Sequence, residues 1–476
     1  MAAGSALTLT SSANPVEGDR LTFHWTTDAP DAKNWVGIYD GARKPGTGSS
    51  LLWKYTAAAE GDVQLDTSAL TGGPYTAYLL AKDGYAVLAQ TAPFSFRPKP
   101  VVPRPHAAVD ALTTAPVAPG AKVSVKLSGL WSRPAGNPAG SATYRKVSGP
   151  AWASVSADGT VTGTAPAAGD PEPIVVGVKD SAGAVDTVTV LVPVADASAR
   201  PRLKAASWNL HDAGAAHTDA LEKQLRVVLS QGLDVLALQE TAGERAKTLA
   251  DALGWYAHQS PGSVGILSRH PLTDLRAATP DLPAVAATLT LPGGRTVRLW
   301  AAHLDETGYG PYALQDGQGT AQVEAAEKAS ARARQAAALA AAVRADLAGK
   351  TPVVLAGALS SPSHLDWTAA TAAAHQGVGP LNWPVSKALQ DAGLTDAFRE
   401  EHPDPVKFPG ATWSPTRKRR GDKPEPQDRI DYVLYAGALK LVEAHTLVTG
   451  WPQAEPNAAA DEWPSDTAAA VATFQL

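Results

Sequence analysis

Polar side chains that could act on a charged substrate follow apolar runs in the second half of this sequence. Glu240 comes shortly after the run 235–238, and Asn209 follows the run 203–208; both runs are typical of buried strands. Such strands would deliver a carboxylate and an amide at the carboxyl edge of a sheet, where ligands gather in α/β proteins. Taken alone, however, a Glu at the end of a strand is usually a solvated carboxylate. The functional interpretation therefore depends on further residues of this kind.

Further candidates stand later in the chain. His303 follows two alanines, Asp431 lies in the segment 427–432, and Asp466 lies in the segment 463–467. A single His next to Leu is usually structural, so each of these pieces is weak by itself. Their value lies in their order along the chain.

That order resembles a known superfamily. The stretch 357–362 reads Gly-Ala-Leu-Ser-Ser-Pro after an apolar run, where the endonuclease/exonuclease/phosphatase superfamily has a strand ending in Gly-Asp-Phe-Asn. Three further segments resemble secreted actinobacterial members of that superfamily: 309–312, 394–398 and 402–405. The resemblance implies hydrolysis of phosphomonoesters or phosphodiesters, commonly with Mg²⁺. It also implies an α/β sandwich of two β-sheets flanked by helices, similar to DNase I.

The resemblance also implies roles for several residues. Glu240 is expected to be a metal ligand, with Asn209 and Asp466 helping to hold the metal or its waters. Two carboxylates and an amide suit a hard cation such as Mg²⁺. Asn209 is also a candidate substrate contact, as are Tyr309 and Tyr312, although packing of these two rings explains them equally well.

The proton-transfer residues of the family pattern are only partly present. By resemblance, His303 would donate to a phosphoryl oxygen, and Asp431 would orient a His acting as general base. The position of that His is Thr467, whose hydroxyl is not basic at neutral pH. Ala358 replaces the family's Asp and has no ionisable atom, and Ser360 replaces its Asn and lacks amide donors. Because one lost acid or base costs about 10²–10⁴ in rate, we expect a degraded or remodelled active site.

Other charged residues lie near the same strand ends. Four of them could in principle substitute for the missing groups: His211, Asp212, His364 and Asp366. The last two match the secreted subgroup and are interpreted as structural. The dense basic run 417–420 is either a solvated loop or a contact for an anionic ligand at the rim of the site.

The chain is long enough for several domains. We expect an immunoglobulin-like or fibronectin-like β-sandwich over 1–97, a Pro-rich linker over 98–106, and a cadherin-like β-sandwich over 107–198. The superfamily-like domain would occupy 199–476. The fold class is therefore multidomain, with two all-β sandwiches followed by an α/β sandwich. Within these, Asp158-Gly159 predicts a hairpin turn, and 325–347 predicts one Ala-rich helix with Arg and Glu on exposed turns.

Composition limits the location and partners. The chain of 476 residues has no cysteine, which excludes disulfides and thiolate metal sites, and its formal net charge of -5 gives no bulk attraction to nucleic acid. No apolar run is long enough to span a bilayer. No signal peptide is visible, but the first domains resemble extracellular modules, so we expect a secreted monomer.

Two classes of function remain open. One is a secreted, metal-dependent phosphoesterase-family protein with a degraded or remodelled site, acting on a phosphorylated small molecule, lipid or nucleic acid. The other is a non-catalytic pseudoenzyme, or an engineered variant, that binds a glycan, a protein or a phosphorylated ligand. In either case the β-sandwich modules are candidates for binding glycan or protein.

Overall fold

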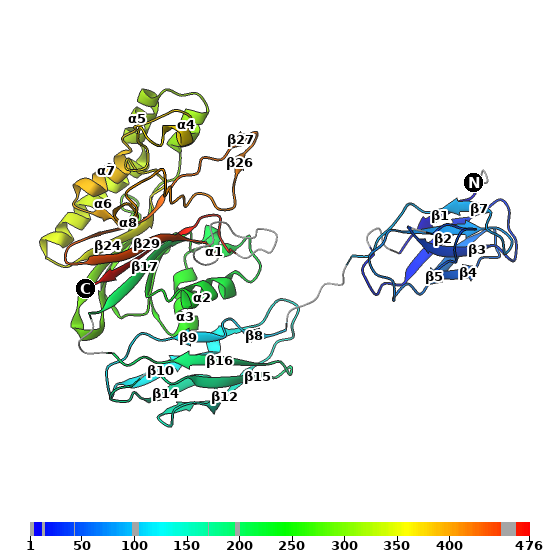
Figure 1. Ribbon diagram of the computed structural model, residues 1–476, viewed down its shortest axis with the longest axis horizontal. Coiled ribbons are helices and arrows are strands. Elements are labelled where there is room, and N and C mark those ends of the chain that lie inside the picture. The colour runs from blue at the N-terminus through cyan, green and yellow to red at the C-terminus, as the bar shows by residue number, and fades with distance from the viewer. Residues whose placement is uncertain are drawn as a thin grey trace. The chain divides into compact units, whose positions relative to one another are not determined.

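The computed structural model describes residues 4–11, 15–41, 43–97, 104–169, 171–195, 200–448 and 463–476 (Figure 1). The chain divides into two compact units, Met1–Pro103 and Arg104–Leu476. Most of the expected Pro-rich linker, residues 98–103, lies outside the described residues. Among the described helices, none combines the length and the apolar character needed to cross a membrane.

The first unit is built from two β-sheets, with the strand orders β1-β2-β5 and β4-β3-β6-β7. Alternate residues of β2 are buried, as expected for a strand with one face on the core. Phe23, Ile38 and Leu79 are fully buried between the sheets. The strands are β1 (Ala6–Leu9), β2 (Leu21–Thr26), β3 (Trp35–Asp40), β4 (Leu52–Tyr55), β5 (Glu60–Leu65), β6 (Tyr75–Leu80) and β7 (Val87–Gln90).

The second unit begins with another all-β part, in sheets ordered β10-β14-β13, β12-β15-β16-β9 and β11-β8. The predicted turn at Asp158-Gly159 is confirmed, because it joins β13 to β14 and Gly159 has a φ of +88°. The strands are β8 (His106–Ala107), β9 (Ala111–Thr113), β10 (Lys122–Lys126), β11 (Trp131–Ser132), β12 (Ala142–Ser148), β13 (Ala153–Val155), β14 (Thr160–Thr164), β15 (Ile174–Asp180) and β16 (Val185–Leu191), with a short 3-10 helix at Ser128–Leu130.

The rest of the second unit contains two six-stranded sheets, in the orders β19-β20-β18-β17-β30-β29 and β21-β22-β23-β24-β28-β25. The apolar strands predicted from 203–208 and 235–238 are β17 and β18, which pair in parallel. The strands are β17 (Arg202–Asn209), β18 (Val235–Gln239), β19 (Tyr256–Gln259), β20 (Val264–Ser268), β21 (Leu272–Arg276), β22 (Ala284–Thr290), β23 (Thr296–His303), β24 (Val353–Ala358), β25 (Thr395–Asp396), β28 (Asp431–Ala436), β29 (Lys440–Leu447) and β30 (Ala469–Gln475), with a small hairpin of β26 (Arg419–Arg420) and β27 (Lys423–Pro424).

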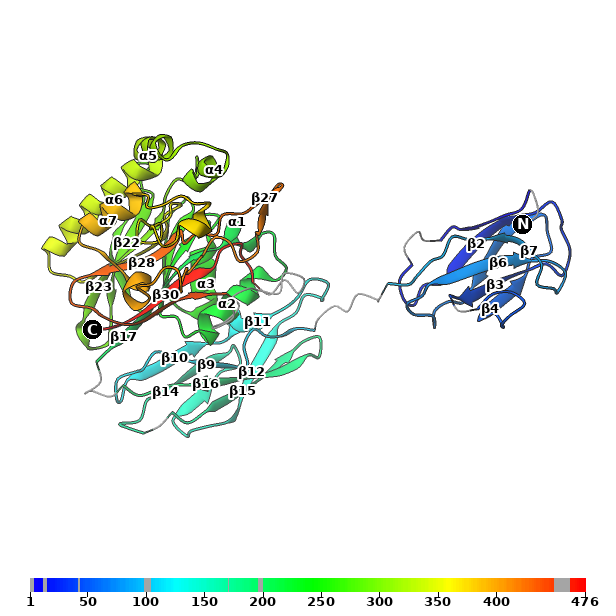
Figure 2. The ribbon, with the colours of Figure 1, turned by 45° about the horizontal axis from the view of Figure 1, so that its top comes forward.

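Helices cover the outer faces of these two sheets. A buried apolar cluster that includes Ala237, Val354 and Phe474 fills the space between the sheets. Helices α6 and α7 lie side by side on the outer face of the second sheet (Figure 2). The helices are α1 (His211–Gly214), α2 (Ala220–Ser230), α3 (Arg245–Leu253), α4 (Gly310–Gln315), α5 (Thr320–Ala329), α6 (Ala331–Ala348), α7 (Pro384–Asp391) and α8 (Ala397–Glu401), with 3-10 turns at Pro292–Gly294 and Ala372–His375.

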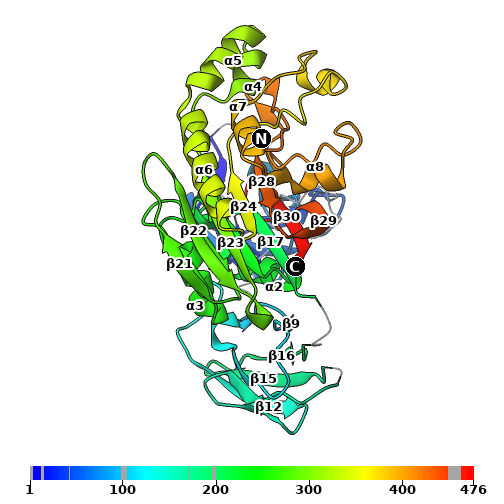
Figure 3. The same cartoon turned by 90° about the vertical axis from the view of Figure 1, so that its left-hand side faces the viewer.

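The α/β part and the preceding β-sandwich share one core within the second unit. Helix α2 lies between β17 and the sandwich strand β9 (Figure 3). At this interface the Glu222 carboxylate accepts hydrogen bonds from Ser132 and Arg226 and lies 3.0 Å from Nε2 of His106. The apolar cluster around Leu225 likewise includes side chains from both parts.

The single helix predicted over 325–347 is wrong in two respects. Two helices, α5 and α6, replace it, because the Ser330 backbone leaves the helical region and its hydroxyl accepts a hydrogen bond from the Ala333 N–H. The Arg and Glu of this region were expected on exposed turns. Arg334 and Arg344 are exposed as expected. Glu327 and Arg332, however, are 2% and 0% exposed and pair with each other, with an N···O distance of 2.8 Å.

Candidate active site

A cleft of about 510 Å³ opens at one edge of the two sheets of the α/β part. Strands β17, β18, β23 and β24 reach this edge with their carboxyl ends, whereas β28 and β30 run antiparallel to their neighbours and begin there. The cleft brings together every residue to which the family resemblance gave a role or a lost role: Asn209, Glu240, His303, Tyr309, Tyr312, Ala358, Ser360, Asp431, Asp466 and Thr467.

Asn209 and Glu240 form a closely bonded pair on one side of the cleft. The Asn209 Nδ2 donates to Glu240 Oε1 at 2.7 Å, and the backbone N–H of Asp212 donates to Glu240 Oε2 at 3.1 Å. The Oδ1 of Asn209 in turn accepts from the backbone N–H of His211 at 2.9 Å. Glu240 has a φ of +50°, a left-handed conformation that is uncommon outside glycine and typical of functional sites. These contacts fix the direction of the Glu240 carboxylate.

Next to this pair lie an imidazole and a second carboxylate. One ligand atom each from Glu240, His303 and Glu306 lies within 4.8 Å of the other two. The Ser263 hydroxyl lies 2.8 Å from Nδ1 of His303 and fixes the orientation of the ring. Burial lowers the pKa of His303, and the carboxylates of Glu240 and Glu306 oppose this shift. Sequence reasoning missed Glu306, although it stands only three positions after His303.

Asp466 faces two cationic or potentially cationic groups. Its Oδ2 lies 2.7 Å from Nη2 of Arg417 and 3.6 Å from Nε2 of His211. Burial raises the pKa of Asp466, and the charges of His211 and Arg417 oppose the shift. Of the four residues considered as substitutes, His211 is therefore the one whose side chain lines the cleft.

Asp431 has a different environment. It is fully buried, and neither oxygen of its carboxylate has a hydrogen-bond partner among the described residues. Burial is the main cause that raises the pKa of Asp431 to about 7; the nearby Thr412 hydroxyl opposes this shift, and the charges of Asp466 and Glu240 contribute to it. A buried carboxylate without a partner is unusual in proteins, because its desolvation is not offset by hydrogen bonds.

The residues around Asp431 explain why it lacks a partner. Ala358 lies on β24, which pairs with β23 on one side and with β28 on the other. In the sheet register, the direct neighbours of Ala358 are His303 on β23 and Asp431 on β28. Its methyl group can neither donate nor accept a proton. The Thr467 hydroxyl donates to the backbone carbonyl of Asn209 at 3.2 Å. The polar group that could have met Asp431 from that side is therefore engaged elsewhere.

Ser360 makes a local contact with the backbone. Its hydroxyl donates to the carbonyl of Leu304 at 3.1 Å, and its φ is +52°. The side chain is 7% exposed, so little of it reaches the open part of the cleft. The short hydroxyl consequently stabilises the turn after β24 and offers little to a ligand.

Tyr309 and Tyr312 form one wall of the cleft. The Tyr309 hydroxyl donates to Asp428 at 2.7 Å, and the Tyr312 hydroxyl donates to Glu425 at 2.5 Å. The two rings meet nearly at right angles with centroids 5.0 Å apart. The rings pack against each other and line the cleft, while their hydroxyls serve internal bonds. Contact of these rings with a substrate stays a prediction.

Arg332 stabilises the loop that carries Glu306 and Thr307 by donating hydrogen bonds to its backbone carbonyls. The guanidinium of Arg332 donates to the backbone carbonyls of Asp305, Thr307 and Gly308 at 3.2, 2.7 and 2.7 Å. The charge of Arg332 is balanced by Glu327, which also accepts from the backbone N–H of Gly310 at 3.1 Å. Sequence reasoning missed this positioning role because both residues were assigned to an exposed face.

The remaining predicted residues divide between the cleft and the scaffold. His364 contacts Ser386 and Gln390 outside the cleft, and Asp366 pairs with Arg399 and Arg429, as expected for structural residues. Within the basic run 417–420, Arg417 lines the cleft. The rest of the run forms hairpin contacts: Arg420 pairs with Asp316 and Lys418 donates to Ser414 and Gln427.

The side chains of the cleft fit a hard divalent cation. Carboxylate and amide oxygens dominate the set, and Glu240, Glu306 and His303 already converge. Each Glu240 oxygen accepts one hydrogen bond from the described residues, which leaves a lone pair on each for a metal. Glu240, His303 and Glu306 are therefore the residues whose ligand atoms converge for such an ion, with Asn209 orienting the first of them. Asp466 lines the same cleft but lies 2.7 Å from Nη2 of Arg417, and its role as a metal ligand stays a prediction.

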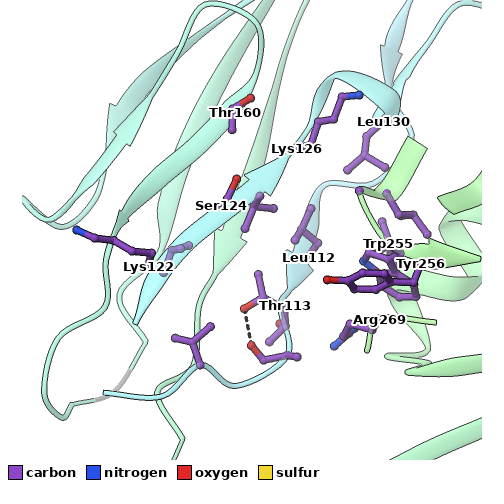
Figure 4. Close-up of a pocket in the computed structure, with 18 residues that line it drawn as sticks. Leu112, Thr113, Lys122, Ser124, Lys126, Leu130, Thr160, Trp255, Tyr256 and Arg269 are labelled. Atoms are coloured by element: carbon purple, nitrogen blue, oxygen red, sulfur yellow. Dashed lines mark hydrogen bonds between the residues drawn. The ribbon is translucent and has the colours of Figure 1, made fainter. Parts of the chain in front are cut away.

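A second hollow, of about 540 Å³, lies between the β-sandwich of the second unit and strand β19 with helix α3 (Figure 4). Its lining mixes aliphatic and polar residues, with Trp255 and Tyr256 on one side and Lys122, Lys126 and Arg269 among its polar residues. None of the described residues that line it is a carboxylate or a histidine. It therefore offers no carboxylate or imidazole ligand for a cation.

Two comparisons with known sequences find a match to this chain. The family model described as Endonuclease/Exonuclease/phosphatase family matches residues 206–466. An uncharacterized protein of Caenorhabditis elegans is 32% identical over 288 residues, which cover 56% of this chain and 90% of that protein.

Solved structures similar to this chain include an endonuclease/exonuclease/phosphatase from Beutenbergia cavernae and an AP endonuclease from Archaeoglobus fulgidus. The first is 18% identical, covers 58% of this chain and 72% of its own, and has a TM-score of 0.37. The second is 17% identical, covers 58% of this chain and 100% of its own, and has a TM-score of 0.40.

Proposed function

Because this chain belongs to the endonuclease/exonuclease/phosphatase family, we propose that its α/β domain binds a phosphate ester together with a divalent cation. Under this proposal, the hydrolytic site of the domain has lost its general acid and its general base. The observation that carries this proposal is the Asp431 carboxylate, which is buried beside Ala358 and Thr467 and has no hydrogen-bond partner among the described residues. A carboxylate that orients a general base should touch that base. Here the neighbouring positions hold a methyl group and a hydroxyl bonded elsewhere.

The groups that would bind the ester are better preserved than those that would move protons. His303 and Arg417 line the cleft and can donate to phosphoryl oxygens, and Arg417 suits phosphate through its planar donors. A bound Mg²⁺ would stabilise negative charge on a phosphoryl oxygen. The Glu240 carboxylate, held by Asn209, is the residue proposed to hold that ion. The substrate class is a phosphorylated small molecule, a lipid or a nucleic acid.

A second candidate function is binding of a phosphate ester without turnover. Arg417 favours it, because this cation stands at the cleft in contact with Asp466 and is half exposed. Under this alternative the cleft would retain affinity while hydrolysis is absent. Export from the cell and a monomeric state belong to the same proposal, on the ground of the two β-sandwiches that precede the α/β domain.

Restoring the missing groups tests the proposal. The chain and its Ala358→Asp, Ser360→Asn, Thr467→His variant would be compared on bis(4-nitrophenyl) phosphate with Mg²⁺. We expect a gain of at least about 10²-fold in kcat/KM, because each acid or base contributes about 10²–10⁴. A matched control carries Ala358→Asn, Ser360→Asn and Thr467→Gln, which are similar in size but cannot transfer protons at neutral pH.

The outcomes separate the alternatives. A gain in the restored variant but not in the matched control supports the proposal. Equal activity in all three proteins would show that the cleft hydrolyses esters by another route. Residual turnover in the unchanged chain that disappears in Glu240→Ala would exclude pure binding, whereas phosphate-ester binding with no turnover would favour it.

A further inference from the structure

The first unit carries a cluster of exposed aromatic rings that has no part in the cleft. In its described residues, the exposed large hydrophobic side chains are Trp53, Tyr55 and Tyr85, which are 55%, 47% and 55% exposed. All three are aromatic, and every described Leu, Ile and Val of this unit is buried or half-buried. Single exposed apolar residues are ordinary, but a contiguous group of them marks an interaction site.

Trp35 contacts Trp53 and Tyr85, and Trp53 in turn contacts Tyr55. These four residues are called the ring cluster below. The centroid of Trp35 lies 6.1 Å from Trp53 and 6.2 Å from Tyr85, with the planes at 77° and 75°. Trp53 lies 5.1 Å from Tyr55 at 80°. Because these neighbours meet edge to face, none of these contacts covers a ring face with a parallel ring. Flat apolar surface therefore remains available to a ligand.

The sheet beneath the ring cluster holds it in place. Trp35 lies on β3, and Gly37, two residues later on the same face, pairs directly with Trp53 on β4. A side chain at Gly37 would meet the Trp35 ring at 2.5 Å. Glycine therefore gives the Trp35 ring room to lie flat against the strand. Trp35 is 8% exposed and serves as the base of the ring cluster.

The loop that presents Tyr85 is also fixed. Lys82 and Asp83 have left-handed backbones, with φ of 51° and 56°. The side chain of Asn34, which is 1% exposed, accepts from the N–H of Lys82 at 3.2 Å. The N–H of Asp83 donates to the carbonyl of Lys33 at 2.9 Å. Binding of a ligand to the rings would therefore cause little loss of conformational entropy in this loop, because the loop is already ordered.

Charged groups stand at the edge of the rings. Asp83 accepts from the Tyr55 hydroxyl at 2.5 Å and from the Lys33 ammonium at 2.7 Å. The hydrogen bond from Lys33 lowers the pKa of Asp83, so the carboxylate stays ionised at neutral pH. The side chains of Lys33 and Asp83 are 67% and 38% exposed and can still reach a ligand. Acceptor and donor groups thus lie beside apolar ring faces.

We propose that the ring cluster binds carbohydrate, with the apolar C–H face of a pyranose ring against Trp53 and Tyr85 and its hydroxyls toward Asp83 and Lys33. A pyranose combines a flat apolar face with polar groups around its rim, which is the pattern that the ring cluster presents. Membrane-surface segments combine Trp or Phe with exposed Leu, and the described residues of this unit expose no Leu. This inference does not depend on the proposal for the cleft.

Binding of the full chain to polysaccharides tests the inference. The probes are laminarin, xylan and hydroxyethylcellulose in native affinity gels, with sedimentation on insoluble cellulose and chitin. We expect retardation or sedimentation with at least one probe, and a loss of about tenfold or more in affinity for Trp53→Ala, Tyr85→Ala. Trp53→Phe, which keeps a ring, should retain most of the binding and shows whether the loss reflects the missing ring.

A matched control comes from the second unit. Tyr256 is 47% exposed, the same fraction as Tyr55, so Tyr256→Ala removes an equally exposed ring outside the ring cluster. Its affinity should equal that of the unchanged chain. The inference is overturned if no polysaccharide retains the chain, or if Trp53→Ala, Tyr85→Ala binds as well as the unchanged chain. Binding confined to phosphatidylcholine–phosphatidylglycerol vesicles would overturn it in favour of a membrane surface.

Discussion

The two ends of the cleft differ in how fully their polar groups are paired. At the paired end, around Asn209 and Glu240, both oxygens of the Glu240 carboxylate accept hydrogen bonds from the protein. At the unpaired end, around Ala358, Asp431 and Thr467, both oxygens of the Asp431 carboxylate are buried without a partner in the described part of the chain. Both carboxylates lie within one cleft of one domain.

This difference indicates which half of the site is structurally complete. A polar network whose members are all hydrogen-bonded holds them in a fixed geometry. In a partly bonded network, hydrogen bonds do not offset the desolvation of the remaining polar groups. The paired end therefore has the properties of a prepared binding site. In the proposed function, the unpaired end would be a catalytic unit from which the partner of Asp431 is missing. Three experiments test this contrast.

The largest effect is expected from removing the support of the loop that carries Glu306, whose carboxylate lies near Glu240 of the paired end. Arg332→Met leaves Glu327 buried and unpaired and frees the loop carbonyls next to Glu306, so we expect a loss of about 3–5 kcal/mol in the free energy of unfolding. Urea denaturation followed by circular dichroism measures this change. Arg334→Met, on the same helix but exposed, is the control and should change stability little. Equal losses in the free energy of unfolding for the two variants would show that the buried Arg332–Glu327 pair contributes no more to stability than an exposed arginine.

The next effect concerns the unpaired end and depends on pH. Burial raises the pKa of Asp431 from 3.8 to about 7, so the folded state loses stability as pH rises through this range. Asp431→Asn removes this loss and should stabilise the protein by up to about 4 kcal/mol near pH 8, since each pKa unit is worth about 1.4 kcal/mol. Near pH 4 the two proteins should be almost equally stable.

Urea denaturation at both pH values, with EDTA present, measures this difference. The exposed Asp422→Asn is the control and should show no comparable dependence on pH. If Asp431→Asn destabilised the protein near pH 8, the Asp431 carboxylate would have a hydrogen-bond partner in solution. The statement that the two ends differ in how their carboxylates are paired would then be refuted.

The smallest effect tests whether the paired end is prepared for a cation. Asn209→Ala removes the donor that orients Glu240, and loss of such a supporting contact typically weakens metal affinity about 10–100-fold. Isothermal titration of the full chain with Mn²⁺ measures this affinity, and Asn382→Ala, an exposed position outside the cleft, serves as the control. Absence of Mn²⁺ binding to the unchanged chain at millimolar concentration would refute the metal part of the proposed function.

A few strands of the α/β domain, and the positions of the polar residues at their ends, could be predicted from the sequence. Apolar runs ending in Asn209, Glu240 and His303 are local signals, and strands that end at the same sheet edge bring such residues together. Glu306 and Arg332 were not found, because their roles depend on a loop and a helix whose positions no local pattern specifies. The break between α5 and α6 was missed for a similar reason, since Ser330 interrupts an otherwise uniform Ala-rich run.

Residue identity alone was sufficient to predict the family, the strand-terminal candidates and the absence of an ionisable group at Ala358. The assembled fold was needed to show that Thr467 donates to the Asn209 carbonyl. It was also needed to show that, among the described residues, Asp431 has no hydrogen-bond partner and Glu240 has two. Hydrogen bonding depends on distance and direction between groups far apart in the chain, and the sheet register that sets these distances appears only when the strands are assembled.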